Sequence, residues 1–167
     1  MEKIKPLEPP DSFHLQAAQG WVELGSHLEA DAELDLIAAK LRVHPDVLEV
    51  RWQIYAKAGQ WEGCIFVAKA ITSLAPDRAI GWINLSFALH ELKRTKEALE
   101  NLVGVAETFS KEPTILYNLA CYCCCLGQLS EARRLLKKAF RYGEAKSMKL
   151  MALNDPDLEP LRAELRE

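Results

Sequence analysis

The sequence predicts an all-α protein, a right-handed superhelical solenoid of about four stacked helix pairs closed by a helical C-terminal cap. One observation is local. From Pro113 to Gly143, apolar residues recur at helical spacing on both sides of Gly127, which predicts two amphipathic helices joined by a tight turn. The other is a register of 34 residues that repeats along the chain. Two helices cannot bury both of their apolar stripes alone, so the repeat predicts that similar pairs stack beside them.

The register is visible in five columns of equivalent positions. The column of Gly127 favours a positive backbone φ at the end of a helix. The column of Ala132 holds small residues, and the other columns are apolar. From the C-terminal copy backwards, the columns are Gly127, Lys93, Gly59 and Gly25; Ala132, Ala98, Cys64 and Ala30; Leu136, Leu102, Ala68 and Leu34; Ala139, Val105, Ile71 and Ile37; and Cys123, Leu89, Tyr55 and Trp21.

This period and these columns resemble the tetratricopeptide repeat (TPR) family. The fourth copy carries Leu116, Leu119, Ala120, Cys123, Gly127, Ala132, Leu136 and Ala139. The second carries Leu48, Tyr55, Gly59, Trp61, Cys64 and Pro76, the third Trp82, Leu85, Ser86, Ala98 and Leu102, and the first Trp21, Gly25, Ala30 and Leu34. The resemblance implies that the first helices of successive pairs line a concave groove, which holds an extended peptide or a helix.

The chain is predicted to consist of a flexible N-terminal tail, four repeats and a cap. The tail covers residues 1–10, the repeats residues 11–143 and the cap residues 144–167. The repeats are bounded at about 11–44, 45–77, 78–112 and 113–143. Before the last pair, the expected helices run over about 11–24, 27–43, 47–58, 61–74, 78–92 and 95–109. Asp11 and Ser12 are expected to cap the first of these helices, and Asp46 the third.

The residues after Gly143 do not begin another repeat. A short helix is expected over 144–153, followed by a turn at 154–157 and a helical segment over 158–165. A solenoid needs such a cap because its last repeat would otherwise expose its apolar stripe. This ending is similar to the tails of many bacterial TPR proteins, which implies a bacterial source.

Composition favours a soluble cytoplasmic domain and argues against nucleic acid and membranes as partners. The chain has 167 residues, 49% of them hydrophobic, and a net charge of −3, so it lacks the basic surface of a nucleic-acid-binding protein. Its longest apolar run, Leu119 to Leu126, is too short to span a bilayer. The polar N-terminus lacks the apolar segment of a secretory signal. Five cysteines, four of them within one helix, favour a reducing compartment.

No pattern in the sequence predicts catalysis, a cofactor or a metal. Cys121, Cys124 and Cys125 share one helix face and leave three interpretations open: packing, redox sensitivity and binding of a soft metal. Packing is favoured, because a structural zinc site needs four ligands and the sequence shows no second ligand pair. The four histidines lie far apart along the chain, and no phosphate-binding glycine loop is present.

The register places candidate groove residues on the first helices of the second, third and fourth repeats. They are Glu49, Gln53 and Lys57; Ile83, Phe87, His90 and Glu91; and Tyr117, Cys121, Cys124 and Cys125. Only Lys57 among them is cationic. A groove that clamps a terminal carboxylate, as in TPR proteins that bind acidic chaperone tails, is therefore not expected.

The sequence favours a non-enzymatic TPR adaptor that binds a peptide or a partner protein in its concave groove. Two alternatives stay open: a small TPR chaperone of a secreted substrate, and a structural protein that self-associates through its own terminus. Formation of a homo-oligomer also stays open. The sequence leaves the partner unnamed.

Overall fold

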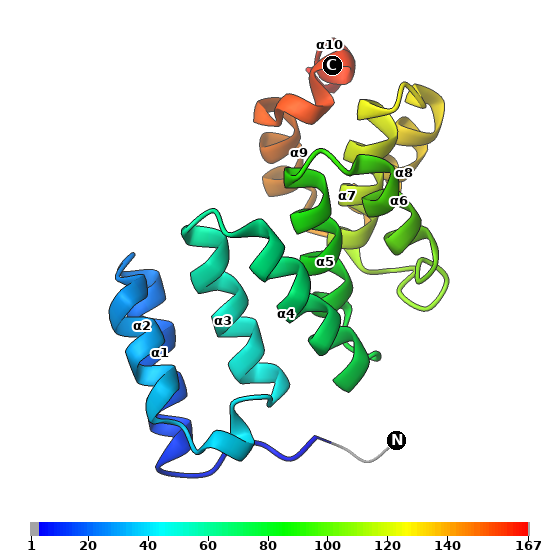
Figure 1. Ribbon diagram of the computed structural model, residues 1–167. Coiled ribbons are helices and arrows are strands. Elements are labelled where there is room, and N and C mark those ends of the chain that lie inside the picture. Colours follow the sequence, from blue (N-terminus) through cyan, green and yellow to red (C-terminus); the bar gives the residue numbers. More distant parts are fainter. Residues whose placement is uncertain (1–3, 167) are drawn as a thin grey trace. The chain divides into compact units, whose positions relative to one another are not determined.

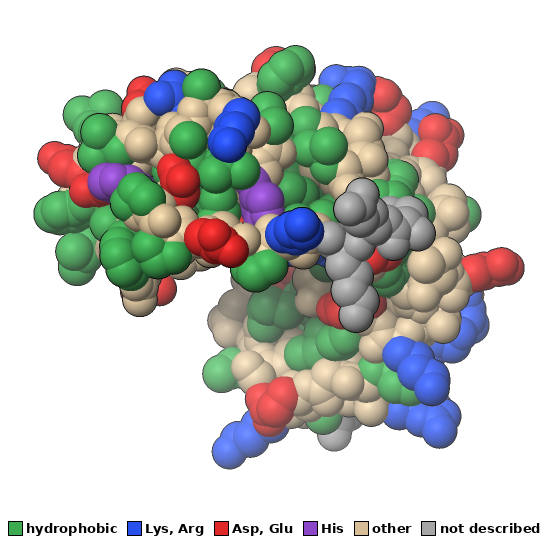
Figure 2. Space-filling model, turned by 90° about the horizontal axis from the view of Figure 1, so that it is seen from below, with side chains coloured by type: hydrophobic (Ala, Val, Ile, Leu, Met, Phe, Trp, Pro, Cys, Tyr) green, Lys and Arg blue, Asp and Glu red, His purple; other side chains and the backbone are tan. Residues whose placement is uncertain are grey.

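The computed structural model describes residues 4–166, and this part of the chain is helical and contains no strand (Figure 1). The all-α prediction is therefore confirmed. The residues form two compact units that meet between Asn84 and Leu85, inside one helix. Among the described helices, none is both long and apolar enough to cross a membrane. Figure 2 shows hydrophobic side chains interspersed with acidic and basic ones on one face.

The first unit is built from adjacent helices that pack as pairs. Its elements are α1 (Asp11–Glu23), α2 (His27–Leu36), the 3₁₀ helix η1 (Ala39–Leu41), α3 (Pro45–Lys57), α4 (Trp61–Leu74) and the first half of α5 (Ala79–Glu91). Helix α1 packs on α2 and α3 packs on α4. A core of Ala18, Ala30, Leu34, Ile37, Val47, Val50 and Ile54 joins the pairs. Leu7 packs against this core, and the Lys5 carbonyl lies 2.9 Å from Nε2 of His44.

The second unit contains the rest of α5 and the remaining helices. These are α6 (Thr95–Val103), α7 (Pro113–Cys125), α8 (Leu129–Tyr142), α9 (Ala145–Asn154), the 3₁₀ helix η2 (Pro156–Leu161) and α10 (Arg162–Leu165). Helix α7 packs on α8, and η2 packs against α7. The C-terminal segment, residues 145–166, thus lies through η2 on α7, the helix that carries Cys121, Cys123, Cys124 and Cys125.

The backbone confirms the 34-residue register. Gly25, Gly59 and Gly127 have φ values of 79°, 68° and 77°, and Lys93, in the same column, has a φ of 62°. All four residues of the small column are 0% exposed: Ala30, Cys64, Ala98 and Ala132. A larger side chain there would separate the two helices of a pair. The division into four repeats and a cap remains a prediction.

The second helix is shorter than predicted. It ends at Leu36 and not near Val43, because Ile37 turns into an extended conformation with ψ of 139° and is fully buried. The Ala38 N–H donates to Oδ1 of Asp11 at 2.7 Å, which fixes this bend. Asp11 is therefore not the N-cap of α1, which has no side-chain cap.

Two further helix ends differ from the prediction. Helix α3 is capped by His44, whose Nδ1 accepts the Asp46 N–H at 3.2 Å, and not by Asp46 itself. Helix α6 ends at Val103 and not near 109, and turns occupy 104–111. Gly104 and the valines beside it are weak helix formers, which explains the early end. The C-terminal helix expected over 144–153 is present as α9, with Glu144 accepting the Ser147 N–H at 2.9 Å.

Candidate functional site

Four of the predicted groove residues lie in the first unit. Gln53 and Lys57 are exposed on α3, whereas Glu49 is partly buried on the same helix. Arg78 donates to Glu49 at 3.4 Å and also to Asp46. Burial raises the pKa of Glu49 above its usual range, and Arg78 opposes this shift. The fourth residue, Ile83, is partly buried on α5. Glu49 therefore takes part in an ion-pair network within its own unit.

The other seven predicted residues lie in the second unit, and five of them line one open cavity of about 420 Å³. Those five are Phe87, His90, Glu91, Tyr117 and Cys121. Cys124 and Cys125 do not line it. The rest of the wall is Asn118 and Tyr122 of α7 with Met151, Asn154, Asp155, Pro156 and Asp157 of the C-terminal segment. The register therefore locates one side of the cavity, and the C-terminal segment supplies the other.

The α7 side of the cavity is buried and already hydrogen-bonded. Tyr117 is 4% exposed, and its hydroxyl donates to Oδ2 of Asp155 at 2.8 Å. The Cys121 thiol donates to the same oxygen at 3.5 Å. Oδ1 of Asp155 accepts the Asp157 N–H at 3.0 Å and caps η2. One carboxylate thus joins the inner face of α7 to the C-terminal turn.

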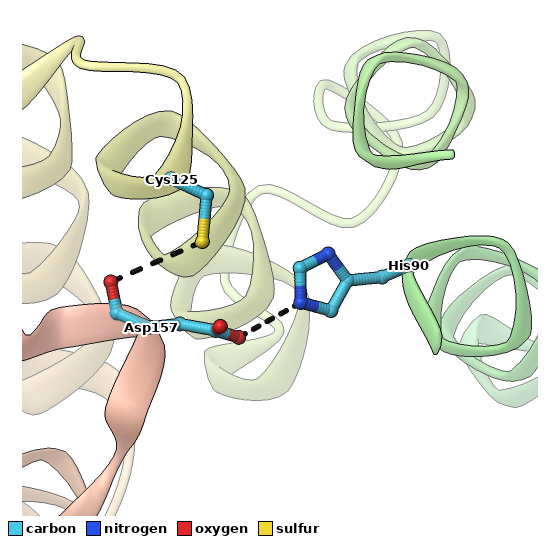
Figure 3. Close-up of side chains that lie close together, drawn as sticks. All are labelled: His90, Cys125 and Asp157. Atoms are coloured by element: carbon cyan, nitrogen blue, oxygen red, sulfur yellow. Dashed lines mark hydrogen bonds and ion pairs between the residues drawn. The ribbon is translucent and has the colours of Figure 1, made fainter. Parts of the chain in front are cut away.

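His90 connects α5 to the same turn. Its Nε2 lies 2.9 Å from Oδ2 of Asp157 (Figure 3). Its Nδ1 lies 3.0 Å from Oγ1 of Thr95. The ring packs against Tyr122 with centroids 4.9 Å apart. Cys125 reaches the same turn, with Sγ 4.0 Å from the carbonyl oxygen of Asp157. Helices α5 and α7 therefore both contact the residues that begin η2.

Sequence reasoning missed the contribution of Asp155 and Asp157 to this surface. It assigned them to a turn with cap residues, which is correct for Asp155. Their inward contacts leave no local pattern, because Asp157 is 67 residues from His90 and Asp155 is 38 residues from Tyr117. The cluster therefore forms without any local catalytic or cofactor-binding motif in the sequence.

The thiols around the cavity are not activated as nucleophiles. Burial raises the pKa of Cys121 above its usual range, and the carboxylates of Asp155 and Asp157 add to the shift. Partial desolvation of its sulfur, together with the charge of Asp157, raises the pKa of Cys125 to about 12. Burial likewise raises the pKa of Tyr117. A catalytic cysteine needs the opposite shift, toward the thiolate.

The open part of the cavity combines apolar groups with carboxylates. Phe87 is 40% exposed and Met151 is 49% exposed. Glu91, Asp155 and Asp157 add carboxylates to the wall, and within residues 4–166 no lysine or arginine lines it. The wall of the cavity therefore presents apolar surface together with carboxylate groups.

Two of the basic residues of α8 form ion pairs away from the cavity. Arg133 donates to both carboxylate oxygens of Glu164 in α10, at 2.6 and 2.7 Å. Arg134 donates to Glu131, one turn earlier in α8. These pairs are largely exposed, so each contributes little to stability.

The arrangement of helices matches solved structures of MamA, a TPR-repeat protein. The RS-1 ArsTM double mutant of MamA is 19% identical, with a TM-score of 0.68 over 96% of this chain and 93% of that one. MamA MSR-1 C2 is 16% identical, with a TM-score of 0.64 over 95% of this chain and 96% of that one. At these identities the likeness shows the fold, which is TPR-like. No family model and no curated protein sequence matches the chain.

Proposed function

We propose that the chain is a non-enzymatic protein-interaction module that anchors a partner peptide in the cavity of its second unit. The observation that carries this proposal is the cavity itself, which is open and lined by Phe87, Met151 and the inner face of α7. Its volume of about 420 Å³ lies within the range of protein ligand pockets. It has room for one or two side chains of a peptide.

The lining defines the chemistry of the proposed anchor. Phe87 and Met151 offer apolar surface, and aromatic residues often carry the largest part of binding energy in interfaces. Glu91 and Asp157 place negative charge beside this surface. We therefore expect an apolar or aromatic side chain flanked by Lys or Arg. A terminal carboxylate would be repelled.

The fold and the thiol chemistry support the same class of function. Stacked helical repeats present extended surfaces to other chains, and the TPR-like fold belongs to this group. The raised pKa values of Cys121 and Cys125 disfavour covalent catalysis. Five free cysteines fit a reducing compartment, and we place the protein in the cytoplasm.

The proposal is tested by selecting peptides from a random display library against the reduced full chain and measuring their affinities by calorimetry. The selected peptides should share an apolar anchor with a basic neighbour. Phe87→Ala should weaken their binding by about tenfold or more, because it removes an aromatic contact in the cavity. Phe66→Ala is the matched control, since Phe66 is 78% exposed on α4 in the other unit.

The opposite pattern would refute this assignment. If the selected peptides bind Phe87→Ala as tightly as wild type but lose affinity when Arg133 and Lys137 are reversed in charge, the binding surface lies on α8. Light scattering on the purified protein, with and without peptide, separates this adaptor role from self-association.

A further inference from the structure

We propose that His90, Cys125 and Asp157 form a binding site for a divalent transition-metal ion of the Zn²⁺ class. Nε2 of His90, Sγ of Cys125 and a carboxylate oxygen of Asp157 all lie within 4.8 Å of one another (Figure 3). The three residues come from α5, α7 and η2 of the second unit. This inference goes beyond peptide binding and does not depend on it.

The donor atoms select the class of ion. Imidazole nitrogen, thiolate sulfur and carboxylate oxygen are the three ligand types that proteins use for Zn²⁺. A thiolate disfavours Mg²⁺ and Ca²⁺, which take oxygen ligands. In a tetrahedral zinc site, bonds of roughly 2.0–2.3 Å place neighbouring ligand atoms about 3.3–3.8 Å apart. The three donor atoms, all within 4.8 Å of one another, lie close to the separations that such a site needs.

Contacts around His90 and Asp157 hold these two ligands in place. Oγ1 of Thr95, 3.0 Å from Nδ1 of His90, can accept the Nδ1 proton and so leave the Nε2 lone pair for the ion. Ligating histidines almost always have such a partner on the other ring nitrogen. Asp155, held by the Tyr117 hydroxyl and bonded to the Asp157 N–H, fixes the turn that presents Asp157.

Three protein ligands leave one coordination position for water or another exchangeable group. Cys121, Asp155 and Asp157 form a second group of donors within 4.8 Å, directly beside the first. Cys125 is exposed, so the ion has access from solvent. On binding, the Cys125 thiol forms a bond from sulfur to the ion and releases its proton to water.

This proposal differs from the interpretation that the sequence favours. The sequence indicates packing for the cysteines, because helix 113–125 lacks a second ligand pair. The fold supplies the missing ligands from positions 35 residues before and 32 residues after Cys125. Cys124, which the sequence places with the same cluster, belongs to neither group of donors.

The test is a Co²⁺ titration of the reduced full chain after removal of metal with a chelator. We expect saturation at one ion per chain, a thiolate-to-cobalt charge-transfer band in the near ultraviolet, loss of the band on adding Zn²⁺, and a higher melting temperature with metal. Cys125→Ala should abolish the band and His90→Gln should weaken binding at least tenfold. Cys123→Ala is the matched control, because Cys123 lies on the same helix outside both donor groups.

Cys125 is exposed, so its replacement should leave the fold intact, and circular dichroism of the metal-free variant checks this directly. The site is refuted if wild type gives no stoichiometric charge-transfer band. It is also refuted if a folded Cys125→Ala variant keeps the band, or if Cys123→Ala alone removes it.

Discussion

Lys93 has a backbone conformation that is adopted by glycine at the three equivalent positions of the register. Its φ of 62° lies in the left-handed region, where a side chain costs about 1–2 kcal/mol. Gly25, Gly59 and Gly127 occupy the same position without that cost. The third copy therefore keeps the turn geometry of the others with a strained residue.

We expect Lys93→Gly to stabilise the protein by about 0.5–1 kcal/mol, because relief of this strain exceeds the added entropy of the unfolded chain. Gly127→Ala should destabilise it by about 1 kcal/mol for the converse reason. Urea unfolding measures both changes. Lys93→Ala is the control, since it removes the charge but keeps the strain. Equal stabilisation by alanine and glycine would show that the side chain, not the backbone, is responsible.

The cysteines differ in accessibility and should differ in reactivity. Cys64, Cys121, Cys123 and Cys124 are buried, and Cys125 is exposed. Burial raises the pKa of Cys64 to about 11. In chelator at pH 8, we expect iodoacetamide to modify Cys125 slowly but before the other four, which should react only on unfolding. Mass spectrometry of the labelled peptides checks this.

The labelling rate of Cys125 should also depend on pH in a particular way. Only the thiolate reacts, and a pKa of about 12 makes the thiolate a small fraction at neutral pH. The rate should therefore rise about tenfold per pH unit from pH 7 to 10. A plateau near pH 9 in the metal-free protein would mean that the pKa of Cys125 is not raised.

At the scale of elements, the turn before η2 joins the C-terminal segment to α7. Asp155 accepts hydrogen bonds from the Tyr117 hydroxyl, the Cys121 thiol and the Asp157 N–H. Replacing Asp155 removes the side-chain cap of η2 and leaves the buried Tyr117 hydroxyl without its hydrogen-bond acceptor. The two effects act on the same packing between η2 and α7.

Asp155→Ala should destabilise the protein by about 2–4 kcal/mol, from the lost cap and the unsatisfied Tyr117 hydroxyl. Urea unfolding followed by far-ultraviolet circular dichroism measures the loss. Glu100→Ala, at an exposed position of α6 in the same unit, is the control and should change stability little. A similar effect of both substitutions would mean that the bonds of Asp155 contribute nothing specific.

The close packing of α7 on α8 should not tolerate a larger residue at Ala132, which is 0% exposed. Ala132→Leu should cost about 1–3 kcal/mol through overpacking. Chemical denaturation measures the cost, with Ala145→Leu at an exposed position of α9 as the control. A neutral Ala132→Leu would contradict the interpretation of the small column.

Elements whose signals are local were predictable from the sequence. The turn at Gly127 and the small column at Ala132 follow from backbone sterics and helix spacing within one repeat, and both are confirmed. Helix α4 has the predicted bounds, Trp61–Leu74, because a turn glycine precedes it and Pro76 follows it. These features depend on residues that lie within one or two turns of each other.

Elements fixed by distant contacts were not predictable. The end of α2 depends on a hydrogen bond from Ala38 to Asp11, 27 residues away. The pairing of His90 with Asp157 depends on how the C-terminal turn folds back on α7. Periodicity specifies which face of a helix is apolar, but not which distant segment covers its inner residues.

At the scale of the whole molecule, the four tryptophans report on only one of the two units. Trp21, Trp52, Trp61 and Trp82 all precede Leu85, where the second unit begins. Tryptophan fluorescence therefore follows the first unit, whereas circular dichroism follows the helices of both. Two such probes can show whether the units unfold together.

Leu119→Ala tests this coupling from the second unit. Leu119 is 3% exposed on α7, so its truncation should cost about 2–5 kcal/mol through lost burial and a cavity. In a repeat fold, each element is stabilised mainly by its neighbours, so a local loss of packing acts first on the unit that contains it. We expect the circular-dichroism midpoint in urea to fall more than the fluorescence midpoint. Leu34→Ala, in the core of the first unit, should lower the fluorescence midpoint more. If both variants move both midpoints equally, α5 couples the units strongly enough for the chain to unfold as one.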